Sequence, residues 1–424
     1  MSYLLRLALL SAWNRRGTLA LVLASIALST ALLWALEGLR RDLRSSFSQA
    51  VSGTDLVVGA RTGSVQLMLY TVFRLGGATN GISMDSVRAV SSHRAVAWTV
   101  PMALGDSYRG FPVMGTTPGY FQHFAYGDRQ ALSLAAGRAF SGTLDGLYEA
   151  VLGAEVAQRL GHRLGDRVTL AHGLVAGAGT EHADKAFTVI GILQRTGTPV
   201  DRTVHVSLQA LEALHLDWAG GAPLPGVRIS AEDARKFDLE PKQVTAALVG
   251  LKSRAAVFAV QRHVAEYRGE ALMGVLPGVA LDELWEALGV GERALQLVSA
   301  LVALVSLAGL VATVLAGLNE RRRELAVLRA MGAGPRDMVW LLLLEGAVVT
   351  LAGALVGVVL AAAAQALAAP ALQARFGILL QVDAPAWSQW AVLAAVLGAG
   401  MLASLLPAWR AYRLSLADGL SPRL

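Results

Sequence analysis

The chain has 424 residues, of which 54% are hydrophobic and only 16% are charged, and its mean hydropathy is +0.49. Globular domains in water carry about 25% charged residues, so this composition predicts a membrane protein. Its net charge of +6 comes from arginines beside apolar runs, which we interpret as a topology signal and not as a nucleic-acid site. The absence of cysteine excludes disulfides, thiolate metal sites and cysteine nucleophiles.

The first predicted membrane helix covers residues 17–36, long enough for the roughly 20 apolar residues that a bilayer crossing needs. Its apolar stretch exceeds the about 7 to 15 residues of a signal peptide and lacks a small-residue cleavage site, so we expect an uncleaved anchor. Residues 1–16 before it are predicted to form a cytoplasmic interfacial helix with an apolar face, and Arg15 and Arg16 at the lipid headgroups. A disordered leader is the alternative for this segment.

Three further membrane helices are predicted over residues 295–318, 338–369 and 387–408. Arginines are concentrated between the second and third spans and in the tail, residues 409–424, whereas the loop of residues 370–386 carries only one arginine and one aspartate. The positive-inside rule therefore places both termini in the cytoplasm and residues 37–294 on the far side of the membrane.

Residues 37–294 are predicted to fold as a mixed α+β domain with helical stalks at both ends, formed by Glu37 to Val51 and Asp282 to Ala294. Alternating apolar residues predict two pairs of strands. The predicted strands are Val96 to Leu104 and Tyr108 to Thr116 around a turn at Gly105 and Asp106, and Arg167 to Ala171 with Ala186 to Leu193. The predicted helices are Ala150 to Leu160, Leu208 to Leu214 and Pro241 to Leu248.

The cytoplasmic segment of residues 319–337 has the pattern of a short capped helix. Asn319 can cap its first turn, and Gly332 can adopt the left-handed conformation that ends it. Apolar residues recur at helical spacing on one face, and charged residues occupy the rest, which suits docking onto a protein. The alternative is a topogenic loop whose arginines contact anionic lipid. The residues of this candidate coupling segment are Glu320, Arg321, Arg322, Arg323, Glu324, Leu325, Leu328, Arg329, Met331 and Gly332.

The third span contains the other candidate residues. Glu345 is an acid within the membrane, for which packing near the interface and a mechanistic role are both open. Gly353 and Gly357 are spaced for close helix packing, within one subunit or between two.

A flexible loop in the α+β domain contains the residues closest to a metal-ligand set. His172, Glu181, His182 and Asp184 lie in or beside it, but their spacing matches no recognised metal-binding pattern. We therefore expect a solvated connection and no metal site, and we find no motif for an enzyme active site.

The segment Asn319 to Gly334 resembles the cytoplasmic loop of MacB-type and FtsX-like ABC permeases, in which Glu-Arg-Arg-Arg-Glu, an apolar pair and Arg-Ala-Met-Gly-Ala recur. The order of one span, a large domain and three spans is similar over nearly the whole chain. Short segments such as Val151-Leu152-Gly153 and Leu164-Gly165-Asp166 also resemble that family's periplasmic core. The resemblance implies a bacterial inner-membrane protein whose large domain is periplasmic and consists of a porter-like part and an inserted small lobe.

The resemblance further implies the non-catalytic permease subunit of a transporter that works by mechanotransmission. It implies a dimer with a second permease copy or paralogue, embedded in membrane lipid, and an ABC ATPase partner that holds the ATP and Mg²⁺. This chain has no Gly-x-x-x-x-Gly-Lys-Ser/Thr loop, so we expect no cofactor on it and a separate ATPase, unlike MacB itself, in which the ATPase is fused. Substrates in the family are hydrophobic molecules, peptides and lipoproteins, and a periplasmic adaptor or substrate protein is a further expected partner. The alternative is an FtsX-like module that activates a periplasmic enzyme without transport.

Overall fold

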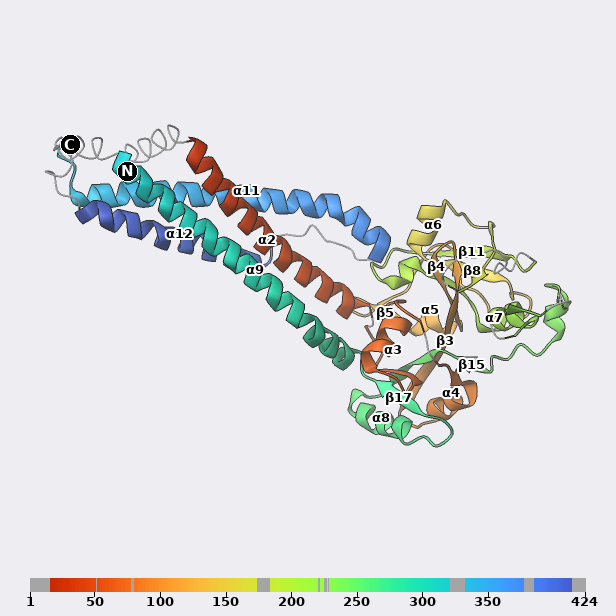
Figure 1. Cartoon of the computed structure of the whole chain (residues 1–424). Coiled ribbons are helices and arrows are strands. Elements are labelled where there is room, and N and C mark those ends of the chain that lie inside the picture. The colour runs from red at the N-terminus through yellow and green to blue at the C-terminus, as the bar shows by residue number, and fades with distance from the viewer. Residues whose placement is uncertain are drawn as a thin grey trace. The chain divides into compact units, whose positions relative to one another are not determined.

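The computed structural model describes residues 16–50, 52–77, 80–173, 184–219, 222–224, 227, 229–320, 332–376 and 385–413. The chain divides into two compact units (Figure 1). One is a helical unit built from the N-terminal helix and the C-terminal third of the chain, and the other is an α+β domain of residues 44–287. Each unit is described separately.

The helical unit contains the four helices that are long and apolar enough to cross a membrane, among the described residues. These helices are α2 (Arg16–Gln49), α9 (Pro277–Glu320), α11 (Pro335–Phe376) and α12 (Trp387–Arg413). Their apolar windows are Ala20–Asp42, Pro277–Ala312, Arg336–Ala369 and Trp387–Arg410. All four contribute buried side chains to one apolar cluster, which includes Ile26, Leu310, Leu342 and Ala408.

The ends of these helices have local sequence causes. The α11 helix begins with Pro335 at its first position, where the missing N–H costs nothing, and the Asp337 carboxylate accepts the backbone N–H of Gly334 at 2.8 Å. The α12 helix repeats this capping, because the side-chain oxygen of Gln389 accepts the N–H of Ala386 at 3.0 Å.

Both predicted stalk regions are helical in the structure. The α2 helix continues through residues 37–49, and α9 begins at Pro277 and runs through residues 282–294 without a break. The predicted helix at residues 1–16 lies almost entirely outside the described residues, as do residues 321–331 of the candidate coupling segment.

The α+β domain is organised around one mixed sheet of eleven strands (Figure 1). The main path of the sheet, in spatial order, is β17 (Leu272–Val275), β1 (Leu56–Ala60), β16 (Ala246–Leu251), β3 (Val96–Tyr108), β4 (Phe111–Thr116), β12 (Val204–Ser207), β8 (Glu149–Leu152), β11 (Phe187–Leu193) and β7 (Leu134–Gly137). Two short strands lie off this path: β10 (Ala171–His172) pairs with β3, and β9 (Arg167–Val168) pairs with β11. The pairs β12–β4 and β11–β8 are parallel, and the other pairs are antiparallel.

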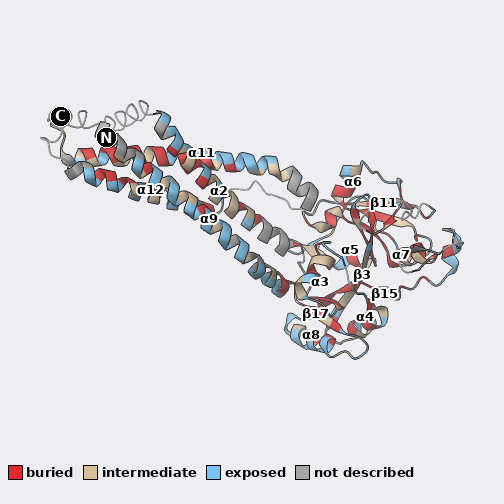
Figure 2. Cartoon of the chain, viewed as in Figure 1, coloured by how far each residue is buried: buried red, intermediate tan, exposed pale blue. Residues whose placement is uncertain are grey.

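Short helices cover the sheet and divide its core into clusters. The helices are α3 (Ser64–Thr71), α4 (Met84–Ser91), α5 (Gly119–His123), α6 (Ala154–Leu160), α7 (Leu208–His215) and α8 (Val257–Ala265), with 3-10 turns η1 (Pro199–Arg202), η2 (Asp233–Lys236) and η3 (Arg254–Ala256). One cluster joins α4 and α8 to β1, β16 and β17, and another joins α6 and α7 to β4, β8, β11 and β12. Within this domain, Figure 2 shows buried residues along the strands of the sheet. Small two-stranded sheets are formed by β13 (Trp218–Ala219) with β14 (Ala222–Pro223), β15 (Gln243–Val244) with β2 (Ile82–Ser83), and β5 (Ala125–Tyr126) with β6 (Gln130–Ala131).

The predicted turn at Gly105 and Asp106 is wrong. The β3 strand continues to Tyr108, with a register shift between Leu104 and Ser107, and the reversal occurs at Arg109 and Gly110. These two residues have φ angles of +47° and +82°, as a two-residue hairpin requires. The bulge keeps Asp106 in the sheet and buries its side chain.

Two predicted helices are also corrected. Residues 243–248 form β15 and the start of β16. The apolar run of β16 is continuous because both of its faces are buried, with Ala246 and Leu248 in one core cluster and Ala247 and Val249 in another, and such runs give no helical period. Residues 150–152 belong to β8, and α6 starts only at Ala154. The intervening Gly153 faces the backbone carbonyls of Val200 and Asp201, where a Cβ atom has no room. The predicted helix at residues 208–214 is confirmed, and the predicted strand pair of residues 167–171 with 186–193 is confirmed only at residues 167–168, which pair with 187–188. Ala171 belongs to β10, which pairs with β3.

Candidate functional site

The candidate coupling segment is described at its two ends. The predicted cap at Asn319 is wrong, because α9 continues as one helix through Asn319 to Glu320. Gly332 has a φ of +101°, the left-handed conformation predicted for the residue that ends the segment. Residues 321–331 lie outside the described residues, so the apolar stripe remains a prediction from the sequence. The capped start of α11 at Gly334 and Pro335 gives the segment a defined exit into the third span.

The two glycines of the third span pack against α2 of the same chain. A Cβ atom on Gly353 would meet the side chain of Ile26 at 2.9 Å, and one on Gly357 would meet the carbonyl oxygen of Ala27 at 2.5 Å and Thr30 Cβ at 2.7 Å. Glycine is therefore required at position 357 for the backbones of α11 and α2 to approach this closely. Both glycines therefore pack within one chain, and packing between two subunits stays a prediction.

Glu345 lies on α11 among buried residues of the helical unit, with 4% of its surface exposed. One residue further along, Gly346 packs against the side chain of Ser404 on α12. Buried hydroxyl groups in the unit donate to carbonyl oxygens of their own helices, as Thr350 does to Gly346 at 2.7 Å and Thr30 to Ile26 at 2.7 Å. Their hydrogen-bonding requirement is therefore met locally, as a lipid environment demands.

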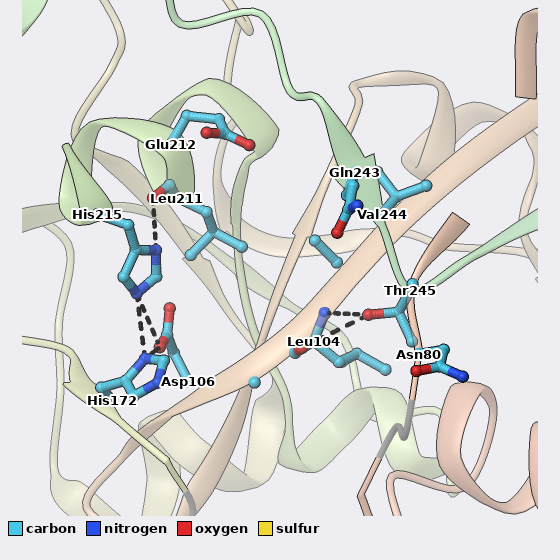
Figure 3. Close-up of a pocket in the computed structure, with 13 residues that line it drawn as sticks. Asn80, Leu104, Asp106, His172, Leu211, Glu212, His215, Gln243, Val244 and Thr245 are labelled. Carbon is cyan, nitrogen blue, oxygen red and sulfur yellow. Dashed lines mark hydrogen bonds and ion pairs between the residues drawn. The ribbon is translucent and has the colours of Figure 1, made fainter. Parts of the chain in front are cut away.

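The strongest concentration of interacting titratable groups lies in the α+β domain. Asp106 on β3, His172 on β10 and His215 at the end of α7 place one oxygen and two nitrogen atoms within 4.8 Å of one another (Figure 3). Burial alone raises the pKa of Asp106, but the hydrogen bonds with His172 and His215 outweigh it and lower this pKa to about 2. Burial lowers the pKa of His215, and its bonds with Asp106 reverse the effect, so this pKa is raised.

These residues border a cavity of about 350 Å³, which Glu212 of α7 and Thr245 also line. Sequence reasoning placed His172 next to Glu181 and His182, which lie outside the described residues, and it missed Asp106 and His215. Asp106 follows a glycine in the sequence, a pattern that predicts a turn, and His215 is far from His172 in the chain. The helical spacing of residues 208–214 predicted α7, but no local pattern paired its end with β3.

A second buried polar group surrounds His205 on β12. Its Nδ1 lies 3.3 Å from the carbonyl oxygen of Val151, and burial, with the nearby charge of Arg74, lowers the His205 pKa to about 3. Among the described residues, His205 Nε2, the Tyr120 hydroxyl and two nitrogen atoms of Arg74 are buried without a hydrogen-bond partner. His205 is therefore neutral at physiological pH.

The architecture of one apolar helix, an α+β domain and three apolar helices defines a multi-pass membrane protein with a large extramembrane domain. Comparison with known families identifies it further. Residues 18–267 match the MacB-like periplasmic core domain, and residues 297–416 match the FtsX-like permease C-terminal region. The first match alone covers more than half of the chain, and the chain belongs to the MacB/FtsX-type ABC permease family. This confirms the predicted family and fold class, and it identifies an inner-membrane protein with a domain of the periplasmic type.

The individual proteins that match this chain have low sequence identity to it. The lipoprotein-releasing system transmembrane protein LolC of Neisseria meningitidis serogroup B (strain ATCC BAA-335 / MC58) is 25% identical over 261 residues, which are 61% of this chain and 57% of that protein. The periplasmic region of MacB from Actinobacillus actinomycetemcomitans aligns with a TM-score of 0.33 and 10% identity over 55% of this chain and 94% of that one. The extracellular domain of the noncanonic ABC-type transporter YknZ from Gram-positive bacteria aligns with a TM-score of 0.31 and 14% identity over 52% of this chain and 99% of that one.

Proposed function

We propose that this protein is the transmembrane subunit of an ABC transporter, in which a separate ATPase binds ATP and Mg²⁺ and drives motion of the periplasmic α+β domain. The substrate class that we favour is lipoproteins, because the relative LolC is named for lipoprotein release. Hydrophobic molecules and peptides are the other classes that the family handles. The observation that carries the proposal is the combination of the family match with two membrane helices that continue beyond the span.

The lengths of these two helices support transmission of movement out of the bilayer. The α2 helix has 34 residues and α9 has 44. At about 1.5 Å per residue they measure roughly 50 and 65 Å, whereas the hydrocarbon layer is about 30 Å thick. A continuous helix resists bending, so displacement at its cytoplasmic end reaches the other end with little loss.

The charge distribution supports an orientation with both termini in the cytoplasm. Five arginines, at positions 321, 322, 323, 329 and 336, lie between α9 and the body of α11, where the positive-inside rule places cytoplasmic loops. This orientation puts the segment from Glu320 to Gly332 on the side where an ATPase has access to ATP.

Features of the helical unit support the proposal that the substrate enters from the periplasm or the outer leaflet. Its described buried hydroxyl groups bond to their own helices, and four helices per subunit leave little room for a continuous polar pore. The family resemblance predicts a second copy or a paralogue. The exposed apolar residues of α9, whose apolar window is 12% buried compared with 33% for α2 and α11, are available to contact that copy or lipid.

The test is purification of the full chain from its native membrane in detergent, followed by identification of stoichiometric partners and measurement of ATP hydrolysis. We expect an ABC ATPase to co-purify and Leu328→Asp to release it. Ala330→Asp, which helical periodicity places on the opposite face of the segment, serves as the matched control and should retain the ATPase. Recovery of an ATPase-dependent wall hydrolase with no movement of lipid or peptide would replace transport by the regulatory alternative. Absence of any ATPase would reject both.

A further inference from the structure

The cluster of Asp106, His172 and His215 is assembled by three elements that the sheet brings together. His172 stands directly opposite Asp106 in the antiparallel pairing of β10 with β3. Asp106 lies within the bulge of β3, between Leu104 and Ser107, and a bulge changes the direction of its side chains. His215 ends α7, so its ring reaches the same point from a helix. Figure 3 shows the three side chains pointing toward one another at the edge of the cavity.

The hydrogen bonds of the cluster leave lone pairs directed at a common point. The Nδ1 of His215 lies 2.9 Å from the carbonyl oxygen of Leu211, which can only accept, so Nδ1 carries hydrogen and Nε2 of the neutral ring is a lone pair. His172 Nδ1 lies 3.2 Å from that Nε2 and 3.0 Å from Asp106 Oδ1. An ionised carboxylate also only accepts. Either a proton on His172 Nδ1, shared between the other two atoms, or a metal ion is therefore required among the three atoms.

The separations of these atoms match a tetrahedral metal site. Bonds of about 2.0 to 2.1 Å to zinc place neighbouring tetrahedral ligands about 3.3 Å apart. His172 Nδ1 lies 3.0 Å from Asp106 Oδ1 and 3.2 Å from His215 Nε2, and His215 Nε2 lies 3.5 Å from Asp106 Oδ1. Two imidazoles and one carboxylate are a ligand set for borderline divalent ions such as Zn²⁺.

The surroundings provide what such a site needs beyond its ligands. The Leu211 carbonyl fixes the tautomer of His215, the arrangement by which proteins commonly orient metal-binding histidines. The indole of Trp218 lies beside the rings of His172 and His215, with centroid distances of 5.3 and 6.2 Å. The cavity of about 350 Å³ borders the cluster and leaves a fourth position for water or for a ligand atom from a bound molecule.

We propose that Asp106, His172 and His215 bind one divalent transition-metal ion of the zinc class, with its fourth coordination position open to the adjacent cavity. The ion replaces the shared proton and links α7 and β10 to β3. This site is independent of the proposed transport function, because it uses no residue of the membrane helices or of the coupling segment.

The test uses the full chain in detergent, free of any histidine tag, stripped with a chelator and titrated with zinc alone. We expect one zinc per chain by elemental analysis and by competition with a chromogenic chelator. His172→Ala and His215→Ala should each weaken binding by more than about tenfold, the loss that even an indirect change to a metal site causes. The control is the double variant His93→Ala/His263→Ala, which removes a ring pair 4.9 Å apart in the same domain and should retain full affinity.

A second measurement on the unaltered protein covers the case in which the variants fail to fold. Cobalt bound to this cluster should give the intense visible absorption of a tetrahedral ion and should be displaced by one equivalent of zinc. Binding of no metal by the wild type, a weak octahedral cobalt spectrum, or an equal loss of affinity in the His93/His263 control would each overturn the proposal.

Discussion

Replacing Gly357 with alanine tests whether the glycines of α11 hold the helical unit of one subunit together. The new Cβ would lie 2.5 Å from the Ala27 carbonyl oxygen and 2.7 Å from Thr30 Cβ, roughly 1 Å inside ordinary contact. The nearest of these atoms belongs to the backbone, so α2 and α11 must separate. Overpacking of this kind costs about 1 to 3 kcal/mol.

The matched control is Gly398→Ala on α12, because nothing lies within 4 Å of the Cβ position there. Alanine is favoured over glycine in a helix by up to about 1 kcal/mol, so this variant should be neutral or slightly stabilising. Because this gain applies to both variants, we expect Gly357→Ala to be less stable than Gly398→Ala by the cost of overpacking alone, about 1 to 3 kcal/mol.

The assay is unfolding of each purified variant in mixed micelles by titration with SDS, followed by circular dichroism and, separately, by the oligomeric state. Equal midpoints for the two variants would refute packing of Gly357 against α2. Loss of the dimer at an unchanged midpoint would instead place this glycine between subunits.

Further predictions concern buried polar groups and a helix end. In the folded protein the pKa of His205 is lowered from 6.5 to about 3, so between these two pH values only the unfolded chain binds the proton. The free energy of unfolding therefore decreases as the pH is lowered, by about 2 kcal/mol at pH 5. His205→Asn should remove this share of the acid sensitivity, measured as unfolding midpoints at pH 7.5 and pH 5. Lys185 and Asp217 form a buried ion pair at 2.8 Å. Lys185→Met leaves the buried carboxylate without its partner, so it should lower the free energy of unfolding by about 3 kcal/mol in chemical denaturation. Adding Asp217→Asn should restore part of this stability, and no recovery would contradict the pairing. Asp337→Ala should destabilise the start of α11 by about 1 kcal/mol and speed amide exchange at Gly334, whereas unchanged exchange would rule out this cap.

The sequence predicted the membrane spans and the family because both depend on long or local signals. A span of about 20 apolar residues can be identified from the sequence without tertiary information. The same is true of the arginine run at residues 321–323 and the glycine at 332, which are local features of the candidate coupling segment. The glycine spacing at 353 and 357 also indicated close packing, but the partner helix could only come from the fold.

The errors arose where burial on both sides of the sheet removes the periodic signal. The strand β16 is apolar throughout because core clusters bury both of its faces, so its sequence also fits a helix. The bulge in β3 carried the strand through Gly105, which alone suggests a turn. The cluster of Asp106 with His172 and His215 depends on sheet pairing between residues 66 positions apart, which no local motif encodes.

The most direct test of the central claim is the sidedness of single cysteines, which this cysteine-free chain permits without background. Arg322→Cys reports on the coupling segment, and Asp128→Cys, at an exposed position of the α+β domain, is its counterpart. In intact spheroplasts, a membrane-impermeant maleimide should label Asp128→Cys at once and Arg322→Cys only after permeabilisation. Labelling of Arg322→Cys from outside intact cells would place the segment away from ATP and contradict coupling to a cytoplasmic ATPase.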